Sequence, residues 1–328
     1  MNYLMLSAGR RAELMKDFRT SMESGARIIA TDNSPYAPAL YFADKQYLVP
    51  KIEDPTYINI ILDICKMESI HAVTTFIDPE IMLLAENREK FTAIGVEVLA
   101  PYTETAKLCF DKFKMFKYLT EKGIKTPKTW GAYEEVKNAI ESGKITLPVF
   151  VKPRCGSGSV GARRIFDLET LKAAFELDES LIAQELMAGD NIYDLDVDVY
   201  VDTITHQPVA IFSKKKISTT IGGANKTISF KDEKLFAFIE SAIQHFKFNG
   251  PIDADFFWKD GEYYLSEVNP RFGGAYLHAY GAGEEFIKLI ERNLKGEAND
   301  SIVGQYEEGV VMMMYDSIVI RKWNQLAD

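Results

Sequence analysis

The sequence predicts an α/β unit at the front of the chain and an α+β unit behind it. Across residues 1–100, short apolar runs alternate with amphipathic helical segments, which is typical of a doubly wound parallel sheet. Residues 195–202 instead alternate strictly between apolar and polar side chains, as an antiparallel strand with one buried face does. Asp253–Trp258 and Glu262–Asn269 flank Lys259-Asp260-Gly261 and predict a β-hairpin.

The elements of the front unit follow in chain order. In one expected helix, Ile58, Ile61 and Cys65 fall on a single face, which we expect to pack on the sheet. Short apolar runs predict strands at Tyr3–Leu6, Arg27–Thr31, Ala72–Phe76 and Val96–Leu99. Helical periodicity predicts helices at Glu13–Ser21, Tyr57–Met67 and Glu80–Glu89.

The rear unit is expected to begin with one helix from Thr103 to Gly123, which carries Asp111 and Lys112. Further along, Asp167 has the side chain of a helix N-cap. Strands are expected at Leu147–Lys152 and Ala162–Phe166, and helices at Leu168–Leu177 and 235–246.

The composition limits the classes of function. The 328 residues include 38 Lys and Arg against 48 Asp and Glu, a formal net charge of −10. Broad binding of nucleic acid or of an anionic membrane requires clustered cations, so neither partner is expected, and a polyanionic ligand must meet a local cationic pocket. Three widely spaced cysteines argue against a disulfide framework, and no apolar stretch approaches the roughly 20 residues of a membrane helix. We therefore expect a cytoplasmic protein.

A glycine-rich loop follows the strand that ends in Lys152. Gly156, Gly158 and Gly161 can turn backbone N–H groups inward as a nest for phosphate oxygens. Their spacing also matches a dinucleotide-binding turn, but such a turn opens directly into a helix, whereas this loop leads into another strand. A flap over phosphates is therefore favoured. The alternative, a flexible hairpin tip, leaves Lys152 at the end of an apolar strand unexplained.

Oxygen-bearing side chains cluster on the predicted hairpin. Glu267 and Asn269 are two apart on a strand, so both project from one face. If Lys259-Asp260-Gly261 forms a three-residue loop, Asp255 joins them on that face, whereas a two-residue loop would place it on the other. Three such side chains can hold Mg²⁺, and Arg271 follows closely enough to contact a transferring phosphoryl group. The alternative is a solvated acidic face on an exposed sheet.

Cys155 and His278 are weaker candidates for chemistry. Cys155 lies in the glycine-rich loop, where a nearby lysine and free N–H groups are expected to lower the pKa of its thiol. His278 follows two glycines and is a candidate for lining a substrate pocket, with a structural role as the alternative.

Together, the glycine-rich loop and the Glu-x-Asn-Pro-Arg segment at 267–271 resemble the ATP-grasp superfamily. The likeness is to the synthetase units of the carbamoyl-phosphate synthetase large subunit and to similar single-unit carboxylate–amine ligases. It covers nearly the whole chain and implies a Rossmann-like pre-ATP-grasp domain at 1–104 and a two-lobed ATP-grasp domain at 105–328. Within the latter it implies a lid at about 126–187 and a core lobe at about 188–328.

The resemblance also implies roles for individual residues. Asp194 matches the acid that binds ribose, and Asn191 is an alternative. The phosphate-binding residues would be Lys112, Lys152, Gly156, Ser157, Gly158, Ser159 and Gly161, and the adenine would lie against Gln184, Glu185, Leu186 and Met187. The metal ligands would be Asp255, Glu267 and Asn269, holding Mg²⁺, or Mn²⁺ in its place. The catalytic cations would be Arg271, Lys214 and Lys216, and which of Lys214, Lys215 and Lys216 points inward stays open, since a solvated strand edge is the alternative for two of them.

The activity implied by the resemblance is that of an ATP- and Mg²⁺-dependent ligase. A carboxylate would attack the γ-phosphate to give an acyl phosphate and ADP, and an amine would then displace phosphate. One alternative is a carbamoyl-phosphate synthetase-like half enzyme that uses bicarbonate and ammonia with a partner chain. A second is a non-catalytic nucleotide-binding module. The strands expected at 309–320 either complete the sheet or pair with a second subunit in a homodimer.

Overall fold

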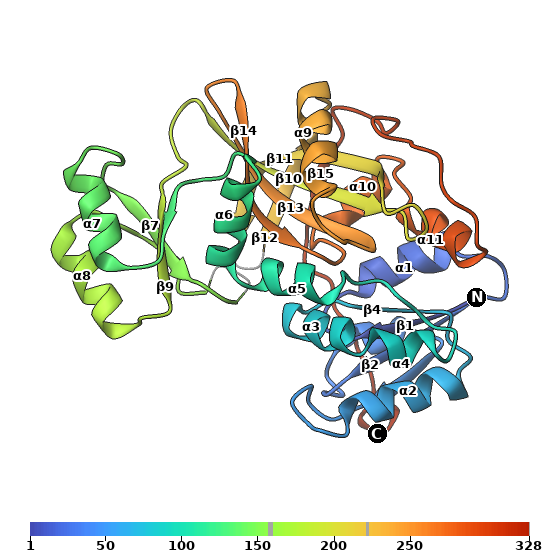
Figure 1. Ribbon diagram of the computed structural model, residues 1–328. Helices are drawn as coiled ribbons and strands as arrows, with labels where there is room; N and C mark the ends of the chain where they lie inside the picture. The colour runs from blue at the N-terminus through green and yellow to red at the C-terminus, as the bar shows by residue number, and fades with distance from the viewer. Residues whose placement is uncertain (157–159, 221–222, 328) are drawn as a thin grey trace.

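The computed structural model describes residues 1–156, 160–220 and 223–327, and three β-sheets organise these residues (Figure 1). Their strand orders are β3-β2-β1-β4-β5, β6-β9-β7-β8 and β14-β13-β10-β11-β12-β15. The first sheet is parallel, and the other two are built from antiparallel pairs. The predicted change from α/β to α+β along the chain is therefore confirmed. Every helix in the described part of the chain is too short or too polar to cross a lipid bilayer.

The front sheet is a doubly wound parallel sheet. Its order reverses between β1 and β4, and the carboxyl ends of strands at such a switch point commonly form a ligand-binding crevice. The predicted helix at 80–89 is divided near Asn87. The strands are β1 (Asn2–Leu6), β2 (Arg27–Asp32), β3 (Lys45–Leu48), β4 (Ala72–Thr75) and β5 (Glu97–Val98). The helices are α1 (Ala12–Ser21), α2 (Tyr57–Met67), α3 (Asp78–Glu86) and α4 (Arg88–Thr92), with a 3-10 turn η1 (Pro38–Phe42).

The single helix expected from 103 to 123 is wrong. The chain forms α5 (Thr103–Phe110) and α6 (Lys112–Glu121), and Asp111 between them has an extended backbone with φ −108° and ψ 97°. The carboxylate of Asp111 accepts hydrogen bonds from the backbone N–H groups of Phe113 and Lys114, at 3.1 and 3.0 Å. Asp111 is thus an N-cap that starts a second helix, because its side chain satisfies donors that a continuous helix would have used internally.

The small antiparallel sheet projects away from the other two, at the left of Figure 1, with α7 and α8 packed on it. Its core includes Val149, Val151, Ile165 and Leu171, all buried. The predicted N-cap is confirmed, since Asp167 accepts from the N–H of Thr170 at 2.7 Å. The strands are β6 (Thr129–Trp130), β7 (Val149–Pro153), β8 (Arg163–Ile165) and β9 (Leu181–Glu185), and the helices are α7 (Tyr133–Glu141) and α8 (Leu168–Leu177).

The large antiparallel sheet carries most of the rear unit. Within the tail, residues 311–313 pair with β12 and complete this sheet, as one of the two expected alternatives required. The strands are β10 (Ile192–Val201), β11 (Pro208–Thr220), β12 (Gly223–Ser229), β13 (Gly250–Lys259), β14 (Glu262–Asn269) and β15 (Val311–Met313). The helices are α9 (Glu233–Ile243), α10 (Tyr276–Gly281) and α11 (Phe286–Leu294), with a 3-10 turn η2 (Trp323–Gln325).

The front unit and the large sheet share one hydrophobic core. Phe18 on α1 packs edge-to-face against Tyr3 of β1 and against Phe272, which follows β14, with ring centroids 5.5 Å apart in both pairs. This contact fixes the chain after β14 against α1 and β1 of the front unit. Residues from both units therefore meet at one place.

Two expectations about the large sheet are wrong. The hairpin loop has two residues, because Lys259 pairs with Glu262, and Asp260 and Gly261 have φ of 52° and 84°. Positive φ at both positions is the conformation of a type I′ turn, for which Asp-Gly is a favoured sequence. A register shift between Asp255 and Phe256 then restores the predicted face, so that Asp255 lies opposite Glu267. The second error is that β10 is not half-buried, because its acidic side is also covered.

Candidate active site

The glycine-rich loop is attached to the start of α6. Arg154, directly after β7, places its Nε and one Nη 2.7 Å from the two carboxylate oxygens of Asp111. The backbone N–H of Lys112 donates to the carbonyl of Arg154 at 3.0 Å, and Asp111 forms an isolated β-bridge with Cys155. The loop and the helix that carries Lys112 are thereby held in one arrangement.

The predicted lysines of this region lie near the predicted metal ligands. The ammonium of Lys112 donates to the carbonyl of Gly156 and lies 3.4 Å from Oε1 of Glu267. Burial lowers the pKa of Lys152, and the charge of Lys112 lowers it further while Glu267 and Asp255 raise it. Three separate elements, α6, β7 and β14, therefore bring these charges together.

Glycine is required at two positions of the loop. Gly156 has φ 112° and Gly161 has φ 75°, which are conformations that L side chains rarely adopt. Ser157, Gly158 and Ser159 lie outside the described residues, so their predicted contacts with phosphate stay predictions.

The predicted metal ligands share one face of the β13–β14 pair. Asp255 lies opposite Glu267, and Asp253 lies opposite Asn269. The amide Nδ2 of Asn269 donates to Asp253 at 3.4 Å, and its Oδ1 accepts no hydrogen bond from the described residues. Two carboxylates and an amide oxygen are ligands that suit Mg²⁺, so the donor set fits the expected cation.

Lys216 contacts one of the predicted metal ligands, whereas Lys214 and Lys215 make other contacts. Its ammonium donates to Asp255 and lies 2.8 Å from Oδ1 of Asp194. The next residue toward the N-terminus, Lys215, points to the other face, where its Nζ is 3.4 Å from the centroid of the Tyr193 ring. Burial raises the pKa of Asp194, and Lys216 opposes that shift. Asn191, the alternative to Asp194, lies exposed in the turn before β10.

A buried acidic cluster surrounds Lys214, and sequence reasoning missed it. The Lys214 side chain is 0% exposed, and its ammonium contacts Asp196 at 2.9 Å and also donates to Asp198. Atoms of Asp196, Asp198 and Asp253 lie within 4.8 Å of one another. Burial raises the pKa of Asp198 to about 6, although Lys214 opposes the shift. Lys214 therefore serves here as the counter-ion of the cluster, while Lys216 is the lysine that contacts Asp255.

One sequence signal could have revealed this cluster. Asp196 and Asp198 continue the period-two series that begins at Asp194, and they pair in register with Asp255 and Asp253 across β10 and β13. Alternation alone predicts that these acids face solvent, because it does not show that a second layer covers the polar face.

Arg271 connects the large sheet with the front unit. Its Nε donates to Oδ1 of Asp78, at the start of α3, over 3.0 Å, and one Nη lies 3.6 Å from Asp253. A cavity lies beside this contact, lined in part by Asp78, Cys109, Gly156, Glu267, Asn269 and Pro270. The space that these residues enclose is thus bordered by the glycine-rich loop, by the predicted metal ligands and by the front unit.

The predicted adenine segment joins the small sheet to the large one. Gln184 is buried, and its Nε2 donates to Oγ1 of Thr129 at 3.0 Å. Glu185 accepts from the N–H of Lys128 at 2.7 Å. Leu186 is half-buried and Met187 is buried. These contacts fix the segment in place, and none of them tests a role in binding adenine.

The Cys155 thiol differs from what the sequence suggested, whereas the contacts of His278 favour its structural alternative. Burial and the charge of Asp111 raise the pKa of the Cys155 thiol, because these effects exceed those of Arg154 and the lysines. Burial lowers the pKa of His278 to about 4, and its Nε2 donates to the carbonyl of Val310 over 3.0 Å. His278 therefore acts as a neutral structural side chain.

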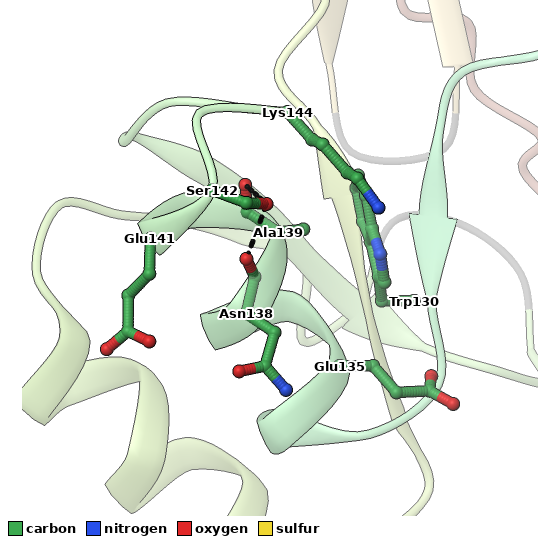
Figure 2. A pocket seen from close by; sticks show the side chains of 7 residues that line it. All are labelled: Trp130, Glu135, Asn138, Ala139, Glu141, Ser142 and Lys144. Carbon is green, nitrogen blue, oxygen red and sulfur yellow. Dashed lines mark hydrogen bonds between the residues drawn. The ribbon is translucent and has the colours of Figure 1, made fainter.

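A second hollow lies on the small sheet, apart from the cavity beside Asp78 and Glu267. Figure 2 shows the seven residues that line it, and they come from β6, from α7 and from the loop that follows α7. The hydroxyl of Ser142 donates to the carbonyl of Asn138 at 2.7 Å. None of the predicted site residues belongs to this lining.

Two family models match the chain. The model described as "PylC-like, N-terminal domain" matches residues 3–99, and the model described as "ATP-grasp domain" matches residues 109–275, just over half of the 328 residues.

Curated relatives cover part of the chain. It is similar to a D-alanine–D-alanine ligase of Nitratiruptor sp., with 24% identity over 226 residues, 64% of this chain and 65% of the relative. A 3-methyl-D-ornithine–L-lysine ligase of Methanosarcina acetivorans is 29% identical over 173 residues, 52% of this chain and 41% of the relative. A carbamoyl-phosphate synthase of Methanobrevibacter smithii is 26% identical over 176 residues, which are 52% of this chain and 45% of the relative. The chain thus spans less than two thirds of the length of each of these relatives.

Solved structures show the same fold over nearly the whole chain. The N5-carboxyaminoimidazole synthetase of Staphylococcus aureus, crystallised with ADP, superposes with a TM-score of 0.74 at 18% identity. The superposition covers 92% of this chain and 78% of that protein.

Proposed function

The chain belongs to the ATP-grasp family, a family of ATP-dependent ligases, and on this premise we propose that it activates a carboxylate as an acyl phosphate and joins it to an amine. Glu267 carries the proposal: it lies opposite Asp255 on the large sheet and 3.4 Å from the ammonium of Lys112 at the glycine-rich loop. A carboxylate with only a structural role would not need to lie beside two other predicted metal ligands and near two lysines.

The proposed nucleotide site uses both sheets of the rear unit. Lys112 and Lys152 bind the phosphates together with backbone N–H groups of the loop from 156 to 161. The segment from 184 to 187 lies against the adenine, and Asp194 binds the ribose. The buried charge of Lys152 is suited to this role, because a phosphate would replace the solvation that it lacks.

The proposed cation ligands are Asp255, Glu267 and Asn269. Mg²⁺, when bound, neutralises charge on the nucleotide phosphates. Lys216 contacts Asp255 and Lys112 contacts Glu267. With the nucleotide bound, both lysines would contact the phosphates as well as these carboxylates. These contacts orient both carboxylates before the nucleotide arrives.

The proposed chemistry needs no covalent enzyme intermediate. A substrate carboxylate oxygen bonds to the γ-phosphorus while the bond from that phosphorus to the β–γ bridging oxygen breaks, which releases ADP. The amine nitrogen then bonds to the acyl carbon, phosphate leaves and the amine gives up a proton. Lys216 and Arg271 stabilise the negative charge of the transferring group, and such preorganised contacts are each worth on the order of 10²–10³ in rate. Closure of the small sheet as a lid excludes water from the acyl phosphate.

The test is the release of ADP and phosphate from ATP and Mg²⁺ in the presence of pools of amino acids and other carboxylates. Release that depends on both an acid and an amine supports the ligase. Release with bicarbonate alone favours a carbamoyl-phosphate synthetase-like half reaction, an alternative supported by the similarity to the Methanobrevibacter smithii protein. No release with any pool supports a nucleotide-binding module, against which the retention of Asp255 and Glu267 argues.

We place the domain boundaries as the sequence suggested, with a front domain at 1–104, a lid at about 126–187 and a core lobe at about 188–328. The separate sheets of Figure 1 support this division. Self-association as a homodimer is part of the proposal as well. Light scattering during gel filtration measures the mass of the assembly and tests it.

A further inference from the structure

Arg11 is a cation whose hydrogen-bonding capacity is largely unused. It lies between β1 and α1, at the carboxyl end of the parallel sheet beside the switch point. A guanidinium has five N–H donors. Within the described residues, Arg11 has one side-chain hydrogen bond, a long one of 3.5 Å to the carbonyl of Gly273, and no carboxylate within 4.0 Å.

The surroundings of Arg11 make this position unusual. Burial, and next the charge of Arg271, lower the pKa of Arg11 to about 10, while the charges of Asp253 and Asp78 oppose this shift. The guanidinium carbon also lies 5.8 Å from the centroid of the Phe76 ring. Two guanidinium groups thus lie near each other at the boundary of the front unit and the large sheet. Such an arrangement is unfavourable unless an anion compensates it.

The neighbouring acids are already engaged by Arg271. Asp78 accepts from Nε of Arg271 at 3.0 Å, and Asp253 lies 3.6 Å from one of its Nη atoms. Arg271 therefore has two carboxylate partners and Arg11 has none among the described residues. Asp78 also lines the cavity that reaches Glu267 and Asn269, so the ion pair of Asp78 with Arg271 lies at the front-unit end of this space.

We propose that Arg11, beside Arg271, binds a substrate carboxylate that is not consumed in the reaction. The inference rests on the ligase function proposed above and narrows its substrate class. The spare carboxylate belongs either to an amino acid that serves as the amine or to a dicarboxylic acid that serves as the acid. A carboxylate suits the site better than a phosphate monoester. The guanidinium of Arg11, which has no carboxylate within 4.0 Å among the described residues, balances a single negative charge, whereas a phosphate carries about −1.5 to −2.

The direct test is a ligand-binding experiment on the full chain. Thermal unfolding is followed with saturating Mg²⁺ and ADP while the standard amino acids, succinate, glutarate and inorganic phosphate are added singly at millimolar concentration. Each compound that raises the midpoint is repeated as the carboxamide of its spare carboxylate. The variants are Arg11→Gln and Arg11→Lys, and the matched control is Arg10→Gln, which alters the adjacent exposed arginine.

We expect at least one acid to stabilise the wild type and Arg10→Gln, while its carboxamide stabilises neither. Arg11→Gln should lose this response, Arg11→Lys should keep part of it, and all four proteins should respond equally to Mg²⁺ and ADP, which shows that the variants are folded. Whether the active compound is an amino acid or a dicarboxylate identifies the source of the carboxylate. The proposal is overturned if no carboxylate shifts the wild type, if phosphate gives the largest shift, or if Arg11→Gln responds as the wild type does.

Turnover separates this proposal from the ligase proposal. With the substrate pair that releases ADP, Arg11→Gln should raise KM for the carboxylate-bearing substrate on the order of 10- to 100-fold, and kcat should change little. The preference for the acid over its carboxamide should fall by the same factor. If ADP is released but that preference survives in Arg11→Gln, the role of Arg11 is wrong and the ligase stands. If carboxylates bind through Arg11 but no pair releases ADP, the ligase is wrong and the carboxylate site stands.

Discussion

Arg154 and Asp111 form a two-bond ion pair in which both nitrogen–oxygen distances are 2.7 Å. The pair joins the strand before the glycine-rich loop to the N-cap of α6. Because Asp111 caps the helix with the same oxygen that accepts from Arg154, one carboxylate sets both the start of the helix and the base of the loop. The lysines of these two elements, Lys112 and Lys152, depend on it for their relative position.

Asp111→Asn should weaken nucleotide binding without unfolding α6. Asparagine is as good an N-cap as aspartate, but it removes the charge that Arg154 contacts. The Arg154 side chain is 39% exposed, so the loss should be limited to about 1 kcal/mol, or roughly fivefold in the dissociation constant. Calorimetric titration with Mg²⁺ and a non-hydrolysable ATP analogue measures it. The control, Arg164→Ala on the exposed edge strand β8, should bind as the wild type does, and equal affinity in Asp111→Asn would contradict the account.

Glu267→Gln should lose turnover more than nucleotide binding. The change removes one carboxylate from the proposed metal ligands but keeps the shape of the side chain, so kcat should fall on the order of 10²–10³. The affinity for ADP without Mg²⁺ should stay within a few-fold. Steady-state release of ADP and a separate binding titration give the two values.

Glu262→Gln is the matched control for Glu267→Gln. Glu262 lies on the same strand but is exposed and pairs with Lys125 at 2.9 Å. It should retain full turnover. Equal activity of the two variants would reject the assignment of Glu267 as a metal ligand.

Lys216→Met and Lys215→Met should differ sharply. The side chain of Lys216 is 12% exposed and contacts Asp255 and Asp194, so its loss should lower kcat on the order of 10². Lys215 lies over the ring of Tyr193 on the opposite face, and its loss should change the free energy of unfolding by no more than about 1 kcal/mol. Turnover and urea unfolding of both variants provide the comparison. A similar loss of turnover in both variants would contradict the assignment of Lys216, and not Lys215, to the catalytic site.

Glu284 should make stability depend on pH. Its side chain is 1% exposed, its Oε1 has no hydrogen-bond partner among the described residues, and burial raises its pKa from 4.5 to about 8. Between these two values the folded protein holds a proton that the unfolded chain has released, so the free energy of unfolding falls as pH rises through this window.

Glu284→Gln removes the titrating group and should remove that part of the slope. Urea unfolding measures the free energy of unfolding of both proteins at about pH 5 and about pH 8. Between these pH values it should fall more in the wild type than in the variant, by a few kcal/mol. At about pH 8 the variant should therefore be the more stable protein. Parallel pH profiles of the two proteins would show that this carboxyl is ionised in the folded state.

Local patterns predicted the elements whose ends and faces are set within one segment. The helix at Tyr57–Met67 has the predicted bounds, and the helix at Leu168–Leu177 begins after the predicted cap Asp167. Periodicity is sufficient for the first helix, which has no capping side chain, and periodicity with a cap for the second, because nearby residues form the buried face and satisfy the first N–H groups.

Tertiary contacts decided the features that the sequence missed. The cap at Asp111, which breaks the helix, is also held by an ion pair with Arg154, 43 residues away in the chain. The shift in pairing that brings Asp255 opposite Glu267 compensates for a turn one residue shorter than expected. Asp196 lies inside the protein because Lys214, from the neighbouring strand, provides its counter-ion. No pattern confined to a single strand contains these partners.

A crystal structure with Mg²⁺ and a non-hydrolysable ATP analogue tests the central claim most directly. The claim is that the glycine-rich loop, α6 and the β13–β14 pair form a single nucleotide site. We expect the cation bonded to oxygens of Asp255, Glu267 and Asn269, with the ammonium groups of Lys112 and Lys152 on the phosphates. The account would be contradicted by a nucleotide bound elsewhere. It would also be contradicted by a cation bound to other residues, with no cation at Asp255, Glu267 and Asn269.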